Sequence, residues 1–143
     1  MIRELVDGLV RGLSQNVAFT TPSAEDPRLQ GRTYAIPFED VWQAATRLVA
    51  GGIKRWELDR ADDQEGVIRG TAHGRLERFT SGITVRITLD ANAQTRVDAL
   101  AASRTGGANL GANRRRLYRF FKDLDRVLEN ASDRSIEALR LDR

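Results

Sequence analysis

Two runs of alternating residues, at 83–89 and 95–101, constrain the fold of this chain more than any other feature. In the first run, apolar residues alternate with Thr84, Arg86 and Thr88. A three-residue turn at 91–93 would place Arg86 opposite Asp98 on the solvent face. The same register pairs apolar residues on the other face, namely Ile87 with Val97, Val85 with Ala99 and Ile83 with Ala101. The pattern predicts an antiparallel hairpin with one buried face.

The remaining elements follow from periodicity and from turn residues. We expect a strand at 33–36, a helix at 39–50 that ends at Gly51-Gly52, and strands at 54–59 and 67–78 separated by the acidic turn 62–66. A helix from Leu110 to about Glu129 closes the domain. Its predicted buried residues recur at helical spacing: Leu117, Phe120, Phe121, Leu124, Val127 and Leu128.

Consecutive hairpins cannot form a parallel, doubly wound sheet. We therefore expect an α+β domain at 32–130, with an antiparallel sheet of four to five strands, helices packed on one face, and the order β-α-β-β-β-β-α. Residues 15–31 contain two prolines and no periodicity, which is typical of a linker. Residues 131–143 are expected to form a loose tail or a short extra helix.

The first 14 residues have the pattern of an amphipathic helix. A helix this short is marginal in water unless it packs against something. Three interpretations remain open: docking on a protein partner, lying in a membrane interface, or packing on its own domain. The apolar side of this helix comprises Ile2, Leu5, Val6, Leu9, Val10 and Leu13.

Positive charge is concentrated in one part of the chain. Residues 104–122 hold six of the 23 Lys and Arg residues and none of the 20 acidic ones. On the predicted final helix, Arg115, Arg119, Lys122 and Arg126 lie opposite the apolar side, and we call these four residues the basic ridge. The ridge favours an acidic protein partner or an anionic membrane surface. Nucleic acid is disfavoured because aromatic residues are not interleaved with these cations.

A glycine-rich segment joins the hairpin to the final helix. Backbone amides near a helix N-terminus bind anions, so Arg104, Gly106, Gly107, Gly111 and Arg114 form a candidate anion site. The segment lacks the motifs of a P-loop or a dinucleotide fold, and a tight structural turn explains its glycines equally. Asn109 is placed to cap the helix, and Asn113 falls within its apolar side, so both are interpreted as structural.

Other residue types limit the chemistry of the chain. It contains no cysteine and a single histidine, His73, so we expect no metal site and no cofactor. Ser103 has no evident base, and no catalytic residue can be nominated. No apolar run approaches the roughly 20 residues of a membrane span, and no signal peptide is recognisable. These observations favour a cytoplasmic protein, with a peripheral membrane location as the alternative.

Several of these residues together resemble the DUF1499 family of bacterial proteins, whose function is unknown. The resemblance covers roughly residues 32–128. Its most specific part is the C-terminal motif, which here comprises Ser103-Arg104, Gly106, Leu110-Gly111, Asn113 and Arg116-Leu117. Weaker matches lie upstream, at Tyr34-Ala35-Ile36-Pro37, Val41-Trp42, Trp56, the strand start from Gly66 to Ile68, Arg78-Phe79 and Thr95-Arg96-Val97.

The chain departs from the family pattern at polar positions. Asn109 replaces an acid, Ser81-Gly82 replaces paired acids, Leu100-Ala101 replaces Arg-Ser, and an early cysteine is absent. Any site that the family builds on those groups is therefore expected to be lost here. With the N-terminal helix and the basic ridge as two docking elements, we expect a non-catalytic accessory or structural subunit that docks on a larger protein assembly. The alternative is a carrier of small apolar ligands, or a weak enzyme, with a cavity between sheet and helices. That cavity would lie beside the small residues Gly70, Ala72, Gly74, Ala99 and Ala101.

Overall fold

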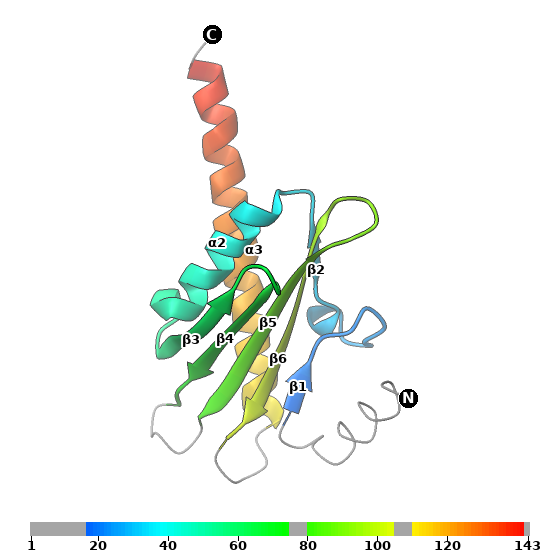
Figure 1. Ribbon diagram of the computed structural model, residues 1–143, viewed down its shortest axis with the longest axis vertical. Coiled ribbons are helices and arrows are strands. Elements are labelled where there is room, and N and C mark those ends of the chain that lie inside the picture. The colour runs from blue at the N-terminus through cyan, green and yellow to red at the C-terminus, as the bar shows by residue number, and fades with distance from the viewer. Residues whose placement is uncertain (1–16, 75–79, 105–109, 142–143) are drawn as a thin grey trace.

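The computed structural model describes residues 17–74, 80–104 and 110–141. Within them, one six-stranded antiparallel sheet carries two helices, which confirms the α+β class (Figure 1). The long strands follow the order β6-β5-β4-β3, and β1 and β2 both pair with the free edge of β6. The predicted strand count was therefore too low by the short strand β1. The elements in chain order are β1 (Val17–Phe19), η1 (Pro27–Leu29), β2 (Arg32–Tyr34), α2 (Phe38–Arg47), η2 (Leu48–Gly52), β3 (Trp56–Asp62), β4 (Val67–Ala72), β5 (Ser81–Leu89), β6 (Thr95–Ser103) and α3 (Leu110–Leu141).

The hairpin of β5 and β6 has the predicted register at every position. Ile87 pairs with Val97, and Arg86 lies opposite Asp98. The Asp98 carboxylate, however, accepts its hydrogen bonds from Arg96, two residues along the same strand, and from Thr20. The alternation correctly predicted which residues lie opposite each other across the two strands. The ion partner of Asp98 is nevertheless Arg96, and both side chains also bond to the 17–31 segment, through Thr20 and Gln30.

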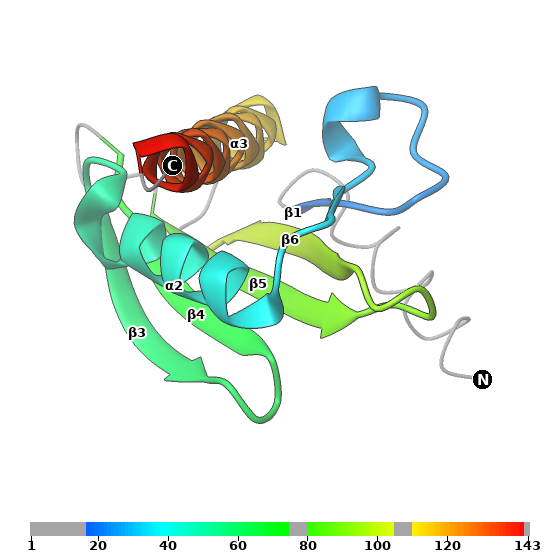
Figure 2. The same cartoon turned by 90° about the horizontal axis from the view of Figure 1, so that it is seen from above.

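Both helices pack on one face of the sheet (Figure 2). The inward residues of β4, β5 and β6 are buried beneath them, and Trp42 of α2 is 8% exposed. Trp56 of β3 stacks on Phe120 of α3 with ring centroids 6.0 Å apart, and Phe121 meets Phe120 edge to face at 5.2 Å. Helix α2 itself ends at Arg47, earlier than predicted, and continues directly into η2. The helical segment stops at the predicted Gly51-Gly52, where Gly51 adopts a φ of 118° that other residues rarely reach.

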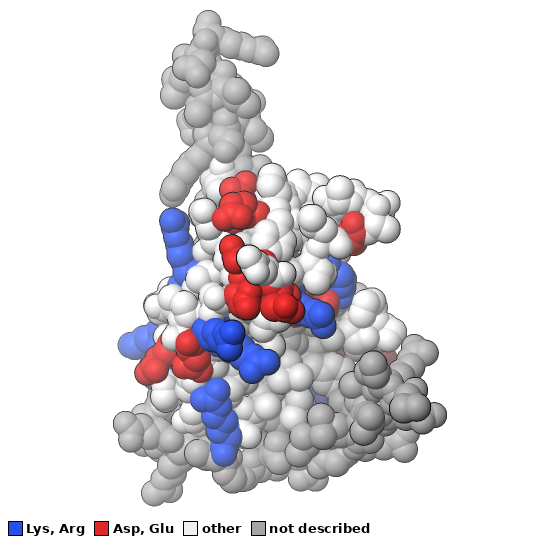
Figure 3. Space-filling view, in the orientation of Figure 1, with Lys and Arg blue, Asp and Glu red and all other residues white. Residues whose placement is uncertain are grey.

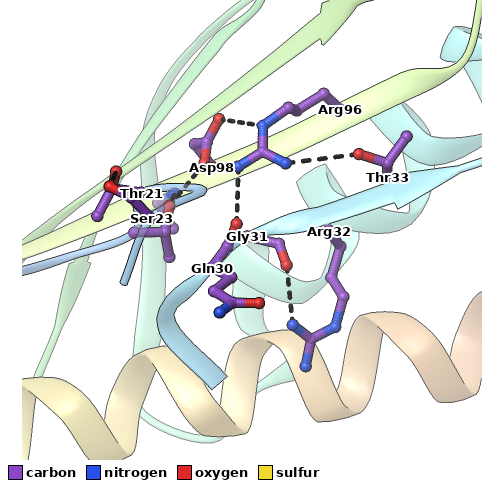
Figure 4. A network of polar contacts seen from close by, with 10 residues as sticks. Thr21, Ser23, Gln30, Gly31, Arg32, Thr33, Arg96 and Asp98 are labelled. Carbon is purple, nitrogen blue, oxygen red and sulfur yellow. Dashed lines mark hydrogen bonds and ion pairs between the residues drawn. The ribbon is translucent and has the colours of Figure 1, made fainter. Parts of the chain in front are cut away.

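The segment predicted as a linker, residues 15–31, is part of the domain in its described portion. Strand β1 pairs with β6 through Ala18 and Ala101, and Leu29 of η1 is buried. The Arg96 guanidinium donates to the Gln30 carbonyl at 2.7 Å and to Asp98 at 2.9 Å, tying the segment to β6 (Figure 4). A three-residue strand has too little alternation to be recognised locally, and its pairing depends on an edge far along the chain.

Two hydrogen bonds between a tyrosine and an aspartate fasten this segment and the following strand β2 to α3. The Tyr118 hydroxyl donates to Asp26 at 2.7 Å, and the Arg28 guanidinium lies 3.9 Å from the Tyr118 ring centroid. The Tyr34 hydroxyl donates to Asp125 at 2.6 Å. These contacts hold the segment against the helix as well as against the sheet edge.

Helix α3 differs from its prediction in two respects. It continues to Leu141 instead of ending near Glu129, so residues 131–141 extend the same helix and form neither a loose tail nor a separate element. Its C-terminal turns project beyond the sheet and α2 (Figure 1). Val127 is 40% exposed, although the periodicity predicted its burial, because at about 100° per residue it lies at the edge of the apolar side; the next residue, Leu128, is still buried. The other predicted apolar residues are buried: Leu117, Phe120, Phe121, Leu124 and Leu128.

No helix in the described part of the chain is long and apolar enough to span a membrane.

Candidate functional site

Four polar residues meet where β5 begins, β6 ends and α3 begins, and we call Ser81, Ser103, Asn113 and Arg116 the polar cluster. Ser81 and Ser103 are partners across the β5–β6 ladder, and Asn113 reaches both from the first turns of α3. The Ser81 hydroxyl donates to Asn113 Oδ1 at 2.6 Å, and Asn113 Nδ2 donates to Ser103 Oγ at 3.0 Å. Ser81 and Asn113 are fully buried. The cluster joins helix to sheet through satisfied polar groups, which is the arrangement a buried amide requires.

Arg116 links this cluster to the surface. Its Nη1 donates to Ser81 Oγ and, at 3.3 Å, to Asn113 Oδ1. Burial lowers the pKa of the Arg116 guanidinium, and the neighbouring charges of Arg115 and Arg55 lower it further. The buried residues Ser81 and Asn113 therefore hold Arg116 in position, while Arg115 and Arg55 place further positive charge near its guanidinium.

An open groove of about 440 Å³ lies above Arg116, between the turn that enters β3 and the start of α3. We call it the basic groove because Lys54, Arg55, Arg115, Arg116 and Arg119 line it. Its remaining lining residues are Ile53, Trp56, His73, Gly74 and Ala112. No carboxylate is among the lining residues of this groove in the described part of the chain. The sequence reasoning assigned Arg115 and Arg119 to the ridge and missed Lys54 and Arg55, which come from a distant turn.

The candidate anion site is only partly described. Gly106 and Gly107 lie outside the described residues, as does the predicted helix cap, Asn109. Gly111 and Arg114 are exposed in the first turns of α3.

Arg104 is directed to the uncovered face of the sheet. Its Nη1 donates to Thr71 Oγ1 at 2.8 Å, and its Nη2 lies 3.5 Å from the Asp59 carboxylate. Thr71 in turn donates to Asp59 at 2.7 Å. The guanidinium thereby joins the end of β6 to β4 and β3, while the preceding Ser103 contacts α3 on the opposite face. The two adjacent residues of the motif serve different sides of the sheet.

All four residues of the basic ridge are exposed on α3. Arg119 pairs with Asp123 one turn later at 2.7 Å, which reduces its contribution to the local potential. On the face of the molecule shown in Figure 3, acidic and basic side chains are interspersed and do not form separate fields. The predicted N-terminal helix, with Ile2, Leu5, Val6, Leu9, Val10 and Leu13, lies outside the described residues.

The single histidine and the potential metal ligands are the other groups that bear on chemistry near the groove and the ridge. His73 Nε2 lies 3.1 Å from Glu57 Oε1, and that carboxylate is 66% exposed. Among the residues that the structure describes, no group of three or more His, Cys, Asp or Glu side chains could hold a metal ion.

Comparison with known proteins places the chain in one family. No curated protein and no solved structure matched it. The family model described as "Protein of unknown function (DUF1499)" matches residues 11–124. The match begins before β1, in agreement with the packing of that strand on the sheet, and it includes the whole polar cluster. Since the model covers most of the chain, this protein belongs to the DUF1499 family.

Proposed function

We propose that this protein is a non-catalytic accessory subunit that docks, through the exposed basic side of α3, on an acidic surface of a larger protein assembly. The observation that carries the proposal is that α3 has two chemically different sides. One side is buried against the sheet, and the basic ridge occupies the exposed side. Beyond Ala131 the helix extends past the sheet and α2 (Figure 1).

The charges beside the ridge support this assignment. Asp125 accepts from Tyr34 and Arg32, and Asp26 accepts from Tyr118 and Arg28, so these carboxylates are engaged in holding the 17–34 segment. Only Asp123 is paired with a ridge residue among the described ion pairs. An acidic partner would therefore meet cations whose charge is incompletely neutralised, which raises association rates and gives specificity.

The test is capture of native complexes from the protein's own cells in mild detergent. One variant carries glutamine at the four ridge positions. Its matched control loses four exposed arginines elsewhere, at Arg47, Arg60, Arg69 and Arg86, so that both variants have the same net charge. A third version lacks residues 1–14.

We expect stoichiometric partners with the wild type and the control, and their loss with the ridge variant and in high salt, where surface charges are screened. Loss of partners only on deletion of residues 1–14 would move the docking element to the N-terminus. If the wild type is recovered alone, the accessory-subunit proposal fails.

A further inference from the structure

The basic groove has a composition that the docking proposal does not explain. Lys54 and Arg55 come from the turn before β3, whereas Arg115, Arg116 and Arg119 come from α3. A solvated charged face needs no such convergence, because like charges brought together repel each other. Among the residues that the structure describes, carboxylates contact the groove's lining at its margins, where Glu57 meets His73 and Asp123 meets Arg119.

The backbone conformation of the turn before β3 helps to place Arg55 beside the arginines of α3. Arg55 has a φ of 70°, in a left-handed region that residues other than glycine seldom occupy. Hydrogen bonds on both sides hold this turn: the Trp56 amide donates to the Ile53 carbonyl at 3.1 Å, and the His73 amide donates to the Arg55 carbonyl at 2.9 Å. An unfavourable backbone conformation at an arginine directs attention to its side chain, since glycine would adopt the same conformation without strain.

The base of the groove is equally well positioned. Arg116 is held by Ser81 and Asn113 of the polar cluster, so its guanidinium loses little freedom when a ligand binds. Guanidinium groups that approach from several directions suit an oxyanion with several acceptor oxygens. Trp56 is only 6% exposed and is stacked on Phe120, so it offers no surface on which a nucleobase could stack.

We propose that the basic groove binds a phosphate group, with Arg55 and Arg116 as its principal contacts and Lys54 and Arg115 supplying further charge. The group would belong to a small phosphorylated molecule or to a phosphomonoester lipid headgroup. This binding does not depend on the docking of α3 to a partner. Lys54 and Arg55 lie outside the ridge, so variants at these positions separate the two proposals.

The experiment uses the full chain and two probes. Inorganic phosphate is titrated at constant ionic strength while amide resonances are followed by NMR, with chloride as the reference anion. Vesicles of phosphatidylcholine, with and without phosphatidic acid, are tested by co-sedimentation. Both probes are applied to the wild type, to Arg55→Gly, and to Arg86→Gln, which removes one exposed charge from the uncovered sheet face.

We expect saturable shifts at residues 54–56 and 112–116, weakened about tenfold in Arg55→Gly and little changed in Arg86→Gln. Arg55→Gly should be as stable as the wild type or more so, because glycine relieves the left-handed strain; loss of binding then cannot be attributed to unfolding. Shifts with phosphate alone identify a small-molecule ligand, and additional sedimentation with phosphatidic acid identifies a headgroup. Absence of both, or equal loss in the two variants, would overturn the proposal.

Discussion

Gly70→Ala tests whether space exists between the sheet and its helices, which is what the carrier interpretation requires. Gly70 lies in β4 beneath η2. A Cβ atom added there would lie 2.4 Å from Val49 Cγ1 and 2.6 Å from the Glu57 carbonyl oxygen. Ordinary Cβ contacts fall at 3.4–4 Å, so both neighbours would have to move by about 1 Å. The Glu57 carbonyl oxygen is part of the backbone of β3, which pairs with β4, so it cannot move aside as the end of a flexible side chain would.

Two opposing effects set the change in the free energy of unfolding caused by Gly70→Ala. Overpacking of a filled core costs about 1–3 kcal/mol, and the backbone contact places this site toward the upper part of that range. Replacing glycine within a strand returns roughly 0.5–1 kcal/mol through lower unfolded-state entropy. We therefore expect Gly70→Ala to lower the free energy of unfolding by about 1.5–2 kcal/mol.

A double-mutant cycle with Val49→Ala isolates the steric cause. Val49→Ala alone removes buried methyl groups and should cost about 2 kcal/mol. In the double variant, the new methyl group at position 70 fills part of the space left by Val49. The combined loss should therefore fall short of the sum by about 1 kcal/mol or more.

The assay is urea unfolding followed by circular dichroism, where a shifted midpoint at unchanged slope reports stability alone. Gly111→Ala is the matched control, because Gly111 lies in a helix and a Cβ atom added there would meet the far end of the long Arg115 side chain, at 3.3 Å. It should be neutral or stabilising by up to about 1 kcal/mol. If Gly70→Ala were neutral or stabilising, the close-packing argument would be refuted and a sheet–helix cavity would have to be sought.

Three further predictions concern the polar contacts. Asn113→Ala removes the acceptor of the buried Ser81 hydroxyl and the donor to Ser103, and should cost about 2–4 kcal/mol in the same urea assay; a loss below about 1 kcal/mol would show that the polar cluster does not join helix to sheet. Tyr34→Phe should cost about 1 kcal/mol by losing its bond to Asp125, and an unchanged midpoint would contradict this. The hydrogen bond from Arg28, followed by that from Tyr118, lowers the pKa of Asp26 from 3.8 to about 2. Because the folded state favours the ionised carboxylate, stability should fall as pH drops through that interval, and less steeply in Tyr118→Phe when thermal unfolding is followed against pH.

Features set by local periodicity were accessible from the sequence. The alternation of 83–89 and 95–101 predicted every apolar pair of the hairpin, and helical spacing predicted the burial of Asn113 beside Leu117. In both cases the side chain's direction depends only on its position along a strand or helix. The same reasoning failed at Val127, because periodicity identifies the centre of the apolar side of a helix but not how far around the helix its partner surface reaches.

Contacts between distant segments were decided by the tertiary structure. Ala18 meets Ala101 only because the edge of β6 is left open, and three residues carry too little pattern to indicate that pairing. Ser81 joins Asn113 because the start of β5 lies under the first turns of α3. Lys54 and Arg55 lie beside Arg116 only after α3 has packed across the sheet. Local pattern therefore predicted the long strands, the helices and most of their inward faces, whereas the sites, which combine residues from several elements, depended on how those faces packed together.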